Sequence, residues 1–171
     1  YLANHSGSKV LCAHADYLDA VDKVRDRMNT VEHFVALEGG KPGWLDYEQL
    51  LAASDGVFER PSIAEGDLLS INYTSGTTSR PKGVMITHRN AWVNAIGTLA
   101  HLPMTPADRF LWTLPMFHAN GWTYTRIVTA AAALHVCLRQ VDATTVYRLV
   151  NQERITMLCA APTVLIAIAS G

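Results

Sequence analysis

Charged side chains are scarce in this sequence. They make up 17% of the residues and leave a formal net charge of −1, whereas about 25% is usual for soluble domains. No run of lysine and arginine exceeds two residues, so the sequence lacks the basic patch that a nucleic-acid partner requires. Long apolar runs are missing too. The longest candidate, residues 130–136, contains His135 and falls far short of the roughly 18 residues of a membrane span. We therefore expect neither nucleic acid as a partner nor a transmembrane segment.

Cysteine is also rare. Cys12, Cys137 and Cys159 are far apart, and none belongs to a CxxC pair of the kind that binds zinc. We interpret them as buried free thiols in a reducing compartment, which favours a cytoplasmic location. The first ten residues show neither the basic start nor the apolar stretch of a signal peptide. Since an initiator methionine is missing as well, we expect the chain to begin inside a longer protein.

Hydrophobic residues, by contrast, are abundant, at 49% of a chain of 171 residues. This length is that of one ordinary domain and allows a real core. Two explanations fit the composition: the chain is mostly core, or other parts of a larger protein cover some of its apolar faces. We favour the second explanation.

Short apolar runs alternate with amphipathic stretches along the chain. Strands are predicted for residues 9–13, 33–37, 68–73, 84–87, 110–114, 133–138 and 155–160. Helices are predicted for residues 16–28, 45–53, 91–102 (with Asn90 as N-cap), from about 120, 142–152 and 163–169. The strand at 68–73 is apolar enough for burial on both faces, and Trp44, Trp92 and Trp112 are expected in the core. The order predicts an α/β fold with a doubly wound, mostly parallel sheet flanked by helices.

The most informative stretch is residues 73–89, YTSGTTSRPKGVMITHR. It leaves the C-terminal end of a predicted buried strand, where open α/β sheets bind ligands. Gly76 lets the backbone approach a ligand, and the hydroxyl and N–H groups of the stretch are donors for phosphate oxygens. Lys82 adds a positive charge on a flexible stem. The pattern predicts an exposed phosphate-binding loop that joins two strands.

The common P-loop is a poorer match to this stretch. That motif reads GxxxxGKS or GxxxxGKT and continues at once into a helix. Here Lys82 precedes Gly83, and residues 84–87 have the composition of a strand. A kinase or GTPase is therefore disfavoured, and the remaining simple alternative is a solvated Ser/Thr loop without a ligand.

The same stretch resembles the phosphate-binding signature of the adenylate-forming (AMP-binding) superfamily, which includes acyl-CoA synthetases, peptide-synthetase adenylation domains and luciferases. That signature is Tyr or Phe, then TSGTTGxPKGV, then His-Arg/Lys-Asn, and the sequence departs from it only at Ser79, where the family usually has Gly. LPMFHANGW (114–122) resembles the segment that enters the acyl pocket, particularly in medium-chain and methylmercaptopropionyl-type CoA ligases. CAAPTVL (159–165) and NHSGSKVL near the start also fit, so the resemblance covers essentially the whole chain.

The resemblance implies that residues 1–171 are part of an N-terminal, ATP/AMP-binding domain. The C-terminal part of that domain and the small C-terminal domain would be absent, and the chain alone would be inactive. The implied reaction activates a carboxylic (fatty) acid with ATP to acyl-adenylate and then acyl-CoA, releasing pyrophosphate and AMP. The acid, ATP, Mg²⁺ and coenzyme A would be its partners and cofactors, and a homo-oligomeric state is left open. Two alternatives remain: an adenylating enzyme that loads a carrier protein, and a non-catalytic nucleotide-binding module.

The resemblance also implies roles for individual residues. Lys82 and His118 would be the catalytic candidates, and Thr74 would contact the metal. The ATP phosphates would be bound by Thr74, Ser75, Gly76, Thr77, Thr78 and Lys82. The acyl site would be formed by Phe117, His118, Asn120, Gly121, Trp122, Ala160, Ala161 and Pro162. Simpler readings stay open: ordinary core packing for Phe117, His118 and Trp122, a helix N-cap for Asn120, and close helix packing for residues 160–162.

Overall fold

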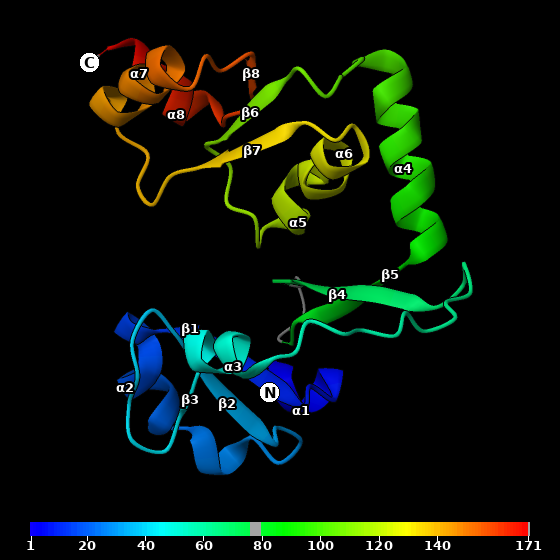
Figure 1. The fold of residues 1–171 in the computed structure, drawn as a ribbon, viewed down its shortest axis with the longest axis vertical. Coiled ribbons are helices and arrows are strands. Elements are labelled where there is room, and N and C mark those ends of the chain that lie inside the picture. Colours follow the sequence, from blue (N-terminus) through cyan, green and yellow to red (C-terminus); the bar gives the residue numbers. More distant parts are fainter. Residues whose placement is uncertain (76–79, 171) are drawn as a thin grey trace. The chain divides into compact units, whose positions relative to one another are not determined.

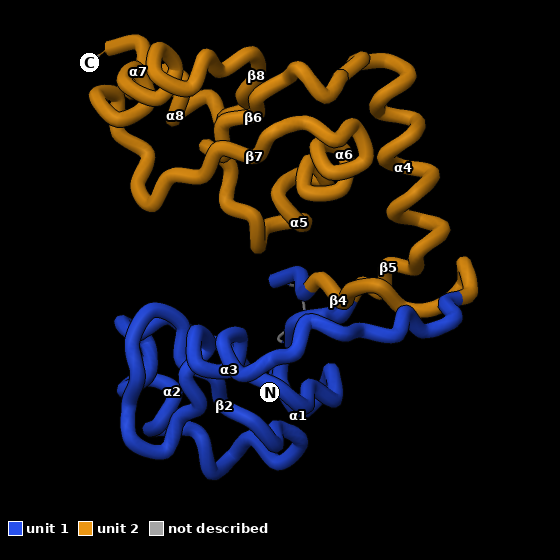
Figure 2. Tube along the Cα trace, viewed as in Figure 1, with its two compact units in different colours: residues 1–63, 73–83 blue, residues 64–72, 84–171 orange. Residues whose placement is uncertain are grey.

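Helices and strands alternate along the chain in the computed structural model, which describes residues 1–75 and 80–170 (Figure 1). The chain divides into two compact units, residues 1–63 with 73–83 and residues 64–72 with 84–171 (Figure 2). The described strands form three sheets, and every strand pair with a defined register is parallel. The predicted mostly parallel α/β architecture is therefore confirmed.

The first unit is built on a parallel sheet in the order β1-β2-β3. Its strands are β1 (Val10–His14), β2 (His33–Leu37) and β3 (Leu45–Asp46), and its helices are α1 (Leu2–Ser6), α2 (Leu18–Asp22) and α3 (Tyr47–Ala53). The core of the unit is a cluster of Leu18, Phe34, Ala36 and Trp44. Strands β1 and β2 confirm the predictions for residues 9–13 and 33–37 to within one residue.

The helix predicted for residues 16–28 is wrong in its extent. Only α2 is α-helical, and 3-10 turns flank it: η1 (Ala15–Tyr17) and η2 (Arg25–Arg27). Between them, Val24 has a non-helical backbone (φ −127°, ψ 1°). The break lies where Asp22 and Arg25 both bind the segment of residues 41–44. These tertiary contacts override the helical pattern of the sequence.

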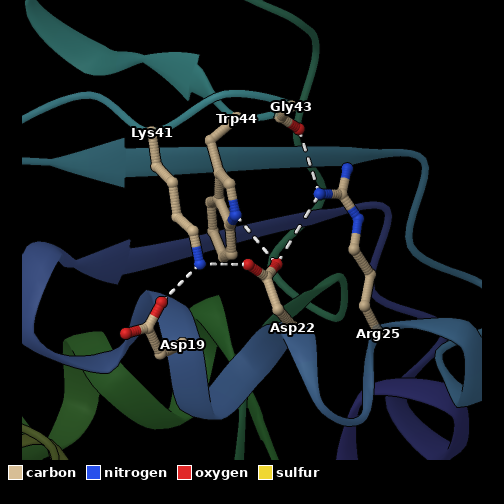
Figure 3. A network of polar contacts seen from close by, with 6 residues as sticks. All are labelled: Asp19, Asp22, Arg25, Lys41, Gly43 and Trp44. Carbon is tan, nitrogen blue, oxygen red and sulfur yellow. Dashed lines mark hydrogen bonds and ion pairs between the residues drawn. The ribbon is translucent and has the colours of Figure 1, made fainter.

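A polar network fastens that segment to α2 (Figure 3). The Lys41 ammonium lies 2.5 Å from a carboxylate oxygen of both Asp19 and Asp22. The Trp44 indole N–H donates to Asp22 at 3.0 Å, and the Arg25 guanidinium donates to the Gly43 carbonyl at 3.0 Å. The hydrogen bond from Lys41 is the main cause that lowers the pKa of Asp22, and the bonds to Asp19 and Asp22 raise the pKa of Lys41.

The helix predicted for residues 45–53 begins two residues later than expected. Leu45 and Asp46 pair with β2 as strand β3. Asp46 is the N-cap of α3, where its side chain accepts a hydrogen bond from the Gln49 N–H at 2.9 Å. The carboxylate therefore stabilises the start of the helix from just outside it, rather than from the first turn.

The second unit contains the parallel sheet β7-β6-β8. Its strands are β6 (Arg109–Trp112), β7 (Leu134–Cys137) and β8 (Met157–Leu158), and its longer helices are α4 (His88–His101), α6 (Tyr124–Ala130), α7 (Ala143–Gln152) and α8 (Pro162–Ala169). Alternate side chains of the central strand enter two different cores. Phe110 and Trp112 pack with residues of α4 and α6, whereas Leu111 packs with residues of α7 and α8. Helices cover both faces of this sheet, as a doubly wound fold requires.

Two helix starts in this unit differ from the prediction. Helix α4 begins at His88 rather than Ala91, because Thr87 is the N-cap and Asn90 completes a capping box from inside the first turn. The Asn90 N–H donates to the Thr87 hydroxyl at 3.2 Å, and the Thr87 N–H donates to the Asn90 side chain at 3.1 Å. The regular helix expected from about residue 120 begins only at Tyr124.

Strands β4 (Leu68–Thr74) and β5 (Lys82–Thr87) form a two-stranded sheet. The prediction that residues 68–73 are buried on both faces is wrong, since β4 pairs with a single described strand and none of its residues is buried. Trp92 and the thiols of Cys12 and Cys137 are also exposed rather than buried. Trp44 and Trp112 do lie in the cores as predicted. Within the described residues, no helix is both long and apolar enough to span a membrane.

Candidate functional site

The predicted phosphate loop has a strand on each side. Strand β4 ends at Thr74 and β5 begins at Lys82, two residues before the strand predicted for residues 84–87, so the prediction that strands flank the loop and that no helix starts at Lys82 is confirmed. Gly76, Thr77, Thr78 and Ser79 lie outside the described residues. Thr74, Ser75 and Lys82 are exposed. Lys82 forms no ion pair with any described residue, so its ammonium is available to an anionic ligand.

Helix α1 and its N-cap residue Tyr1 contact both ends of this loop within the first unit. The Tyr73 hydroxyl and the His5 imidazole share a hydrogen bond of 2.7 Å, and their rings meet edge to face. On the other side, the Arg80 guanidinium lies 5.9 Å from the centre of the Tyr1 ring. These contacts were not predicted from the sequence, because the partners are separated by more than 60 residues and neither motif indicates that it pairs with the other.

The predicted acyl segments leave the same edge of the sheet in the second unit. Strands β6 and β8 are parallel, with Leu111 opposite Leu158, so their carboxyl ends lie side by side. The Thr113 hydroxyl, just beyond β6, donates to the Cys159 carbonyl at 2.7 Å. Residues 114–118 and 160–162 therefore start from adjacent points, at the edge where open α/β sheets bind ligands. Their role in binding an acid stays a prediction.

A left-handed turn follows the first of these segments. Every residue from Ala119 to Thr123 has a positive φ, between 45° and 68°. Only Gly121 adopts such values without strain, and other residues pay about 1–2 kcal/mol each, with asparagine the least disfavoured. The carbonyl of His118 accepts hydrogen bonds from the N–H groups of Gly121 and Trp122, at 2.9 and 3.3 Å. This short element, α5 (Ala119–Trp122), replaces the start of the regular helix that the sequence predicted.

Glycine is the one residue type that fits position 121 of the turn. A β-carbon there would lie 2.4 Å from an atom of the Trp112 ring. That ring is buried, donates a hydrogen bond of 3.0 Å to His135 and stacks on its imidazole. Because the indole is held on two sides, it has little freedom to move away. Gly121 therefore allows the backbone of the turn to pack directly against the Trp112 ring.

The turn places its aromatic side chains at the surface of this chain. Phe117 is 87% exposed and Trp122 is 65% exposed, and His118 is exposed as well. The alternative that these residues are ordinary core residues is therefore wrong for the described chain. Ala160 is half-buried and Ala161 and Pro162 are exposed, with Pro162 as the first residue of α8.

A groove of about 450 Å³ runs beside the turn, between α4 and α6. Its lining is mostly apolar and consists of Asn94, Thr98, Leu102, Ala119, Trp122, Thr123, Tyr124 and Ile127. Burial, aided by a hydrogen bond with Cys159, raises the pKa of Tyr124 to about 12, so the phenol is neutral at physiological pH. The volume lies within the roughly 300–1,000 Å³ of small-molecule sites.

Asn120 does not cap a helix, so that alternative is wrong. The N-caps of α5 and α6 are His118 and Thr123. The Asn120 side-chain oxygen instead accepts hydrogen bonds from Arg126 at 2.6 Å and from Asn72 at 2.7 Å. Asn72 and Arg126 were not predicted as site residues, since nothing in the sequence connects a strand position with a helix position 54 residues away.

Comparison with known proteins identifies the family of this chain. The family model described as "AMP-binding enzyme" matches residues 1–171. The chain belongs to the AMP-binding enzyme family. It is 37% identical over 180 residues to 4-hydroxybutyrate–CoA ligase 2 of Metallosphaera sedula, covering 99% of this chain and 32% of that protein. It is 31% identical over 185 residues to the peroxisomal trans-cinnamate:CoA ligase of Petunia hybrida, covering 95% of this chain and again 32% of the relative.

A solved structure confirms the fold of this AMP-binding chain. The N-terminal domain of FACL13 from Mycobacterium tuberculosis, in an inhibitor-bound crystal structure, matches with a TM-score of 0.88 and 28% identity. The match covers 99% of this chain and 42% of that one. The chain spans about a third of the length of the curated relatives that it matches. The resemblance drawn from the loop motif is thereby confirmed at the level of family and fold.

Proposed function

We propose that the full-length protein is an AMP-forming acid–CoA ligase, of which residues 1–171 form part of the N-terminal, nucleotide-binding domain. One observation carries the proposal: a hydroxyl-rich segment lies between β4 and β5 in the sequence, and the first residue of β5 is an exposed lysine without an ion-pair partner among the described residues. This arrangement suits the phosphates of ATP and lacks the helix of a P-loop. The free thiols fit a cytoplasmic location.

The residues of the loop bind and orient the nucleotide in this proposal. Thr74 and Ser75 donate their hydroxyls to phosphate oxygens, and Gly76, Thr77 and Thr78 belong to the same phosphate site by their match to the family motif. The Lys82 ammonium neutralises negative charge as pyrophosphate leaves. Such a reaction needs little covalent chemistry from the protein, and its rate depends on charge stabilisation and on holding the reactants in line.

Magnesium suits this site as an ion bound mainly by phosphate. Among the described residues, no group of three or more His, Cys, Asp or Glu side chains gathers around one point. Magnesium in nucleotide sites takes most of its ligands from phosphates and water, with one or two from the protein. The exposed Thr74 hydroxyl is a suitable oxygen ligand of that kind, and the ion would supply charge neutralisation at the phosphates.

The acid occupies the region of the aromatic turn in this proposal. Phe117, His118 and Trp122 bound the site, and the groove beside Trp122 takes the remainder of the acid. His118 is exposed and belongs to the segment that follows β6, and in this proposal it closes the site around the reacting carboxylate. Ala160, Ala161 and Pro162, which start from the neighbouring strand β8, form a second wall of this site, where their small side chains leave room.

Acid-dependent exchange of pyrophosphate into ATP by the full-length protein tests the proposal. Because relatives carry names that include 4-hydroxybutyrate, acetate and trans-cinnamate, the panel should contain short, hydroxylated and aromatic acids. We expect exchange with at least one acid, and thioester formation once coenzyme A is added. Exchange with transfer only to a carrier-protein thiol would favour a carrier-loading enzyme. ATP binding without exchange for any acid would favour a non-catalytic nucleotide-binding module.

Lys82→Ala links the activity to the loop. A charge-assisted hydrogen bond contributes about 1.5–3 kcal/mol, so we expect a loss of exchange rate of roughly ten- to a hundredfold with an unchanged melting temperature. Lys23→Ala is the matched control, since Lys23 also lacks an ion pair with a described residue and lies far from the motif in sequence. Equal rates for the two variants would contradict the role of Lys82.

A further inference from the structure

Asn120 lies where three segments of the second unit meet. Its side-chain oxygen accepts hydrogen bonds from Arg126 of α6 at 2.6 Å and from Asn72 of β4 at 2.7 Å. A longer bond of 3.3 Å comes from the Ser70 hydroxyl, also on β4. The Arg126 guanidinium in turn lies 3.3 Å from the Ser70 hydroxyl. One amide therefore joins the left-handed turn to both a strand and a helix.

The chemistry of arginine fixes the orientation of this amide. A guanidinium has only N–H donors, so the atom of Asn120 that faces it must be the oxygen. Asn72 then has to present its NH₂ group, as it does at 2.7 Å. The two short bonds use both lone pairs of the carbonyl oxygen, which explains why the contact with Ser70 is the longest.

Arg126 has no carboxylate partner among the described residues. It is partly buried, and this burial lowers the pKa of its guanidinium, which nevertheless stays charged at neutral pH because arginine titrates so far above it. Burying a charge is costly unless hydrogen bonds compensate for the lost water. Its oxygen partners are the side chains of Asn120 and Ser70. Asn120 is therefore the principal acceptor that offsets the burial of this charge.

The turn needs such support because its backbone is strained. Ala119, Trp122 and Thr123 have positive φ values of 45°, 53° and 68°, which side chains of these types rarely adopt. Backbone strain of this kind persists only where the surrounding structure holds it in place. The Thr125 hydroxyl adds a bond of 3.1 Å to the Asn120 carbonyl. Asn120 is thus held through both its side chain and its backbone, in the middle of the strained run.

We propose that Asn120, clamped by Asn72 and Arg126, is a positioning residue that fixes the left-handed turn and with it the acid-binding side chains Phe117, His118 and Trp122. The inference rests on the proposed function, since it assigns the acid site to this turn. Without the clamp the turn relaxes toward ordinary backbone conformations, and the three side chains sample several positions. The acid then binds less tightly, whereas ATP binding through the loop is preserved.

Three variants distinguish the effect of the clamp, the hydrogen bonds of Asn120 with Asn72 and Arg126, from a general loss of structure. Asn120→Gly removes the amide but accepts a positive φ, so it does not add backbone strain. Asn120→Asp keeps an acceptor oxygen for Arg126 and is among the few side chains that tolerate this conformation. Arg126→Met keeps most of the stem and removes every donor. The matched control is Arg148→Met on α7, where Arg148 makes a surface contact with Gln152.

The assay measures KM for the acid, KM for ATP and the melting temperature of the full-length protein. We expect Asn120→Gly and Arg126→Met each to raise KM for the acid by roughly ten- to a hundredfold, the effect of losing one charge-assisted hydrogen bond, with KM for ATP within about twofold of the wild type. Since both variants break the same contact, the double variant should be no worse than either one. Asn120→Asp should stay within about threefold, and Arg148→Met should match the wild type.

Several outcomes would overturn the inference. An unchanged KM for the acid in Arg126→Met would show that the clamp does not position the site, and equal rises in both KM values would indicate a general loss of structure. If Asn120→Gly unfolds, Arg126→Lys decides instead, because it keeps the charge but loses the planar fork and should still raise KM for the acid several-fold. Wild-type protein without exchange for any acid would refute the proposed function, and this inference with it.

Discussion

Among the glycines whose surroundings the structure describes, Gly121 is the one where an added methyl group would meet the closest neighbouring atom. The new methyl group would lie 2.4 Å from one carbon of the Trp112 ring and 2.8 Å from another. The backbone at this position has φ +62°, which disfavours any residue with a β-carbon. Both the clash with the ring and the positive φ destabilise the alanine variant, so the two effects add. The turn cannot move away from the Trp112 ring without changing its own backbone conformation.

The magnitude follows from these two contributions. A left-handed conformation costs a residue other than glycine about 1–2 kcal/mol. Inserting a carbon into a packed contact costs about 1–3 kcal/mol more, and the hydrogen bond and stacking with His135 hold Trp112 in place. We therefore expect a loss of about 2–5 kcal/mol in the free energy of unfolding, which lowers the melting temperature.

Differential scanning calorimetry of the full-length protein is the assay, with Gly97→Ala as the matched control. Gly97 lies within α4, and a β-carbon there meets no described atom within 4 Å. Alanine is favoured over glycine in a helix by about 0.5–1 kcal/mol, so the control should stabilise the protein slightly. A melting temperature for Gly121→Ala equal to that of the wild type would refute the description of the turn and its contact with Trp112.

Two further predictions concern local stability. Thr87→Ala removes the capping box of α4 and should cost about 0.5–2 kcal/mol, measured by chemical denaturation, whereas Thr87→Ser should cost much less. Lys41→Met should lower the melting temperature of the first unit at neutral pH by removing the network of Asp19 and Asp22. The pKa of Asp22 is lowered in the folded state, so its contribution is present above the ordinary aspartate pKa and is lost as the pH falls through the lowered value. The pKa of Lys41 is raised, so its contribution is lost only as the pH rises through that value. The difference in melting temperature between wild type and variant should therefore be constant from about pH 5 to 9 and shrink below about pH 4. A difference that persists unchanged at pH 2 would contradict this assignment.

The parts of the molecule that the sequence predicts well are those that local chemistry determines. Strand β2 and helix α7 follow from an apolar run and from a helical pattern that starts after the capping residue Asp142. The strand–loop–strand order around the phosphate loop follows in the same way, because residues 84–87 have β-type side chains directly after the glycine. In each case the local preference and the tertiary environment favour the same conformation.

The errors occur where tertiary contacts compete with the local pattern. The helix expected over residues 16–28 breaks because Asp22 and Arg25 bind the segment of residues 41–44. The exposure of Trp92 and Cys137 has a different cause, since composition indicates that a residue is apolar but not which part of a protein covers it. Both side chains stay exposed in this chain, which spans about a third of the length of the relatives that it matches.

The left-handed turn of residues 119–123 is the feature that the sequence predicts least well, since a regular helix was expected there. Every local preference of Ala119, Trp122 and Thr123 favours a right-handed helix or a strand, so no periodicity or propensity predicts positive φ at all three positions. Two sets of long-range contacts meet at the turn: Asn120 is bonded to β4 and α6, and Gly121 packs against the Trp112 ring. Natural sequences agree with their folds at most positions and depart from local preference mainly where function requires it. The departure here coincides with the segment that, by its resemblance to other family members, is predicted to enter the acid site, and this coincidence is the reason for proposing that the strain belongs to that site.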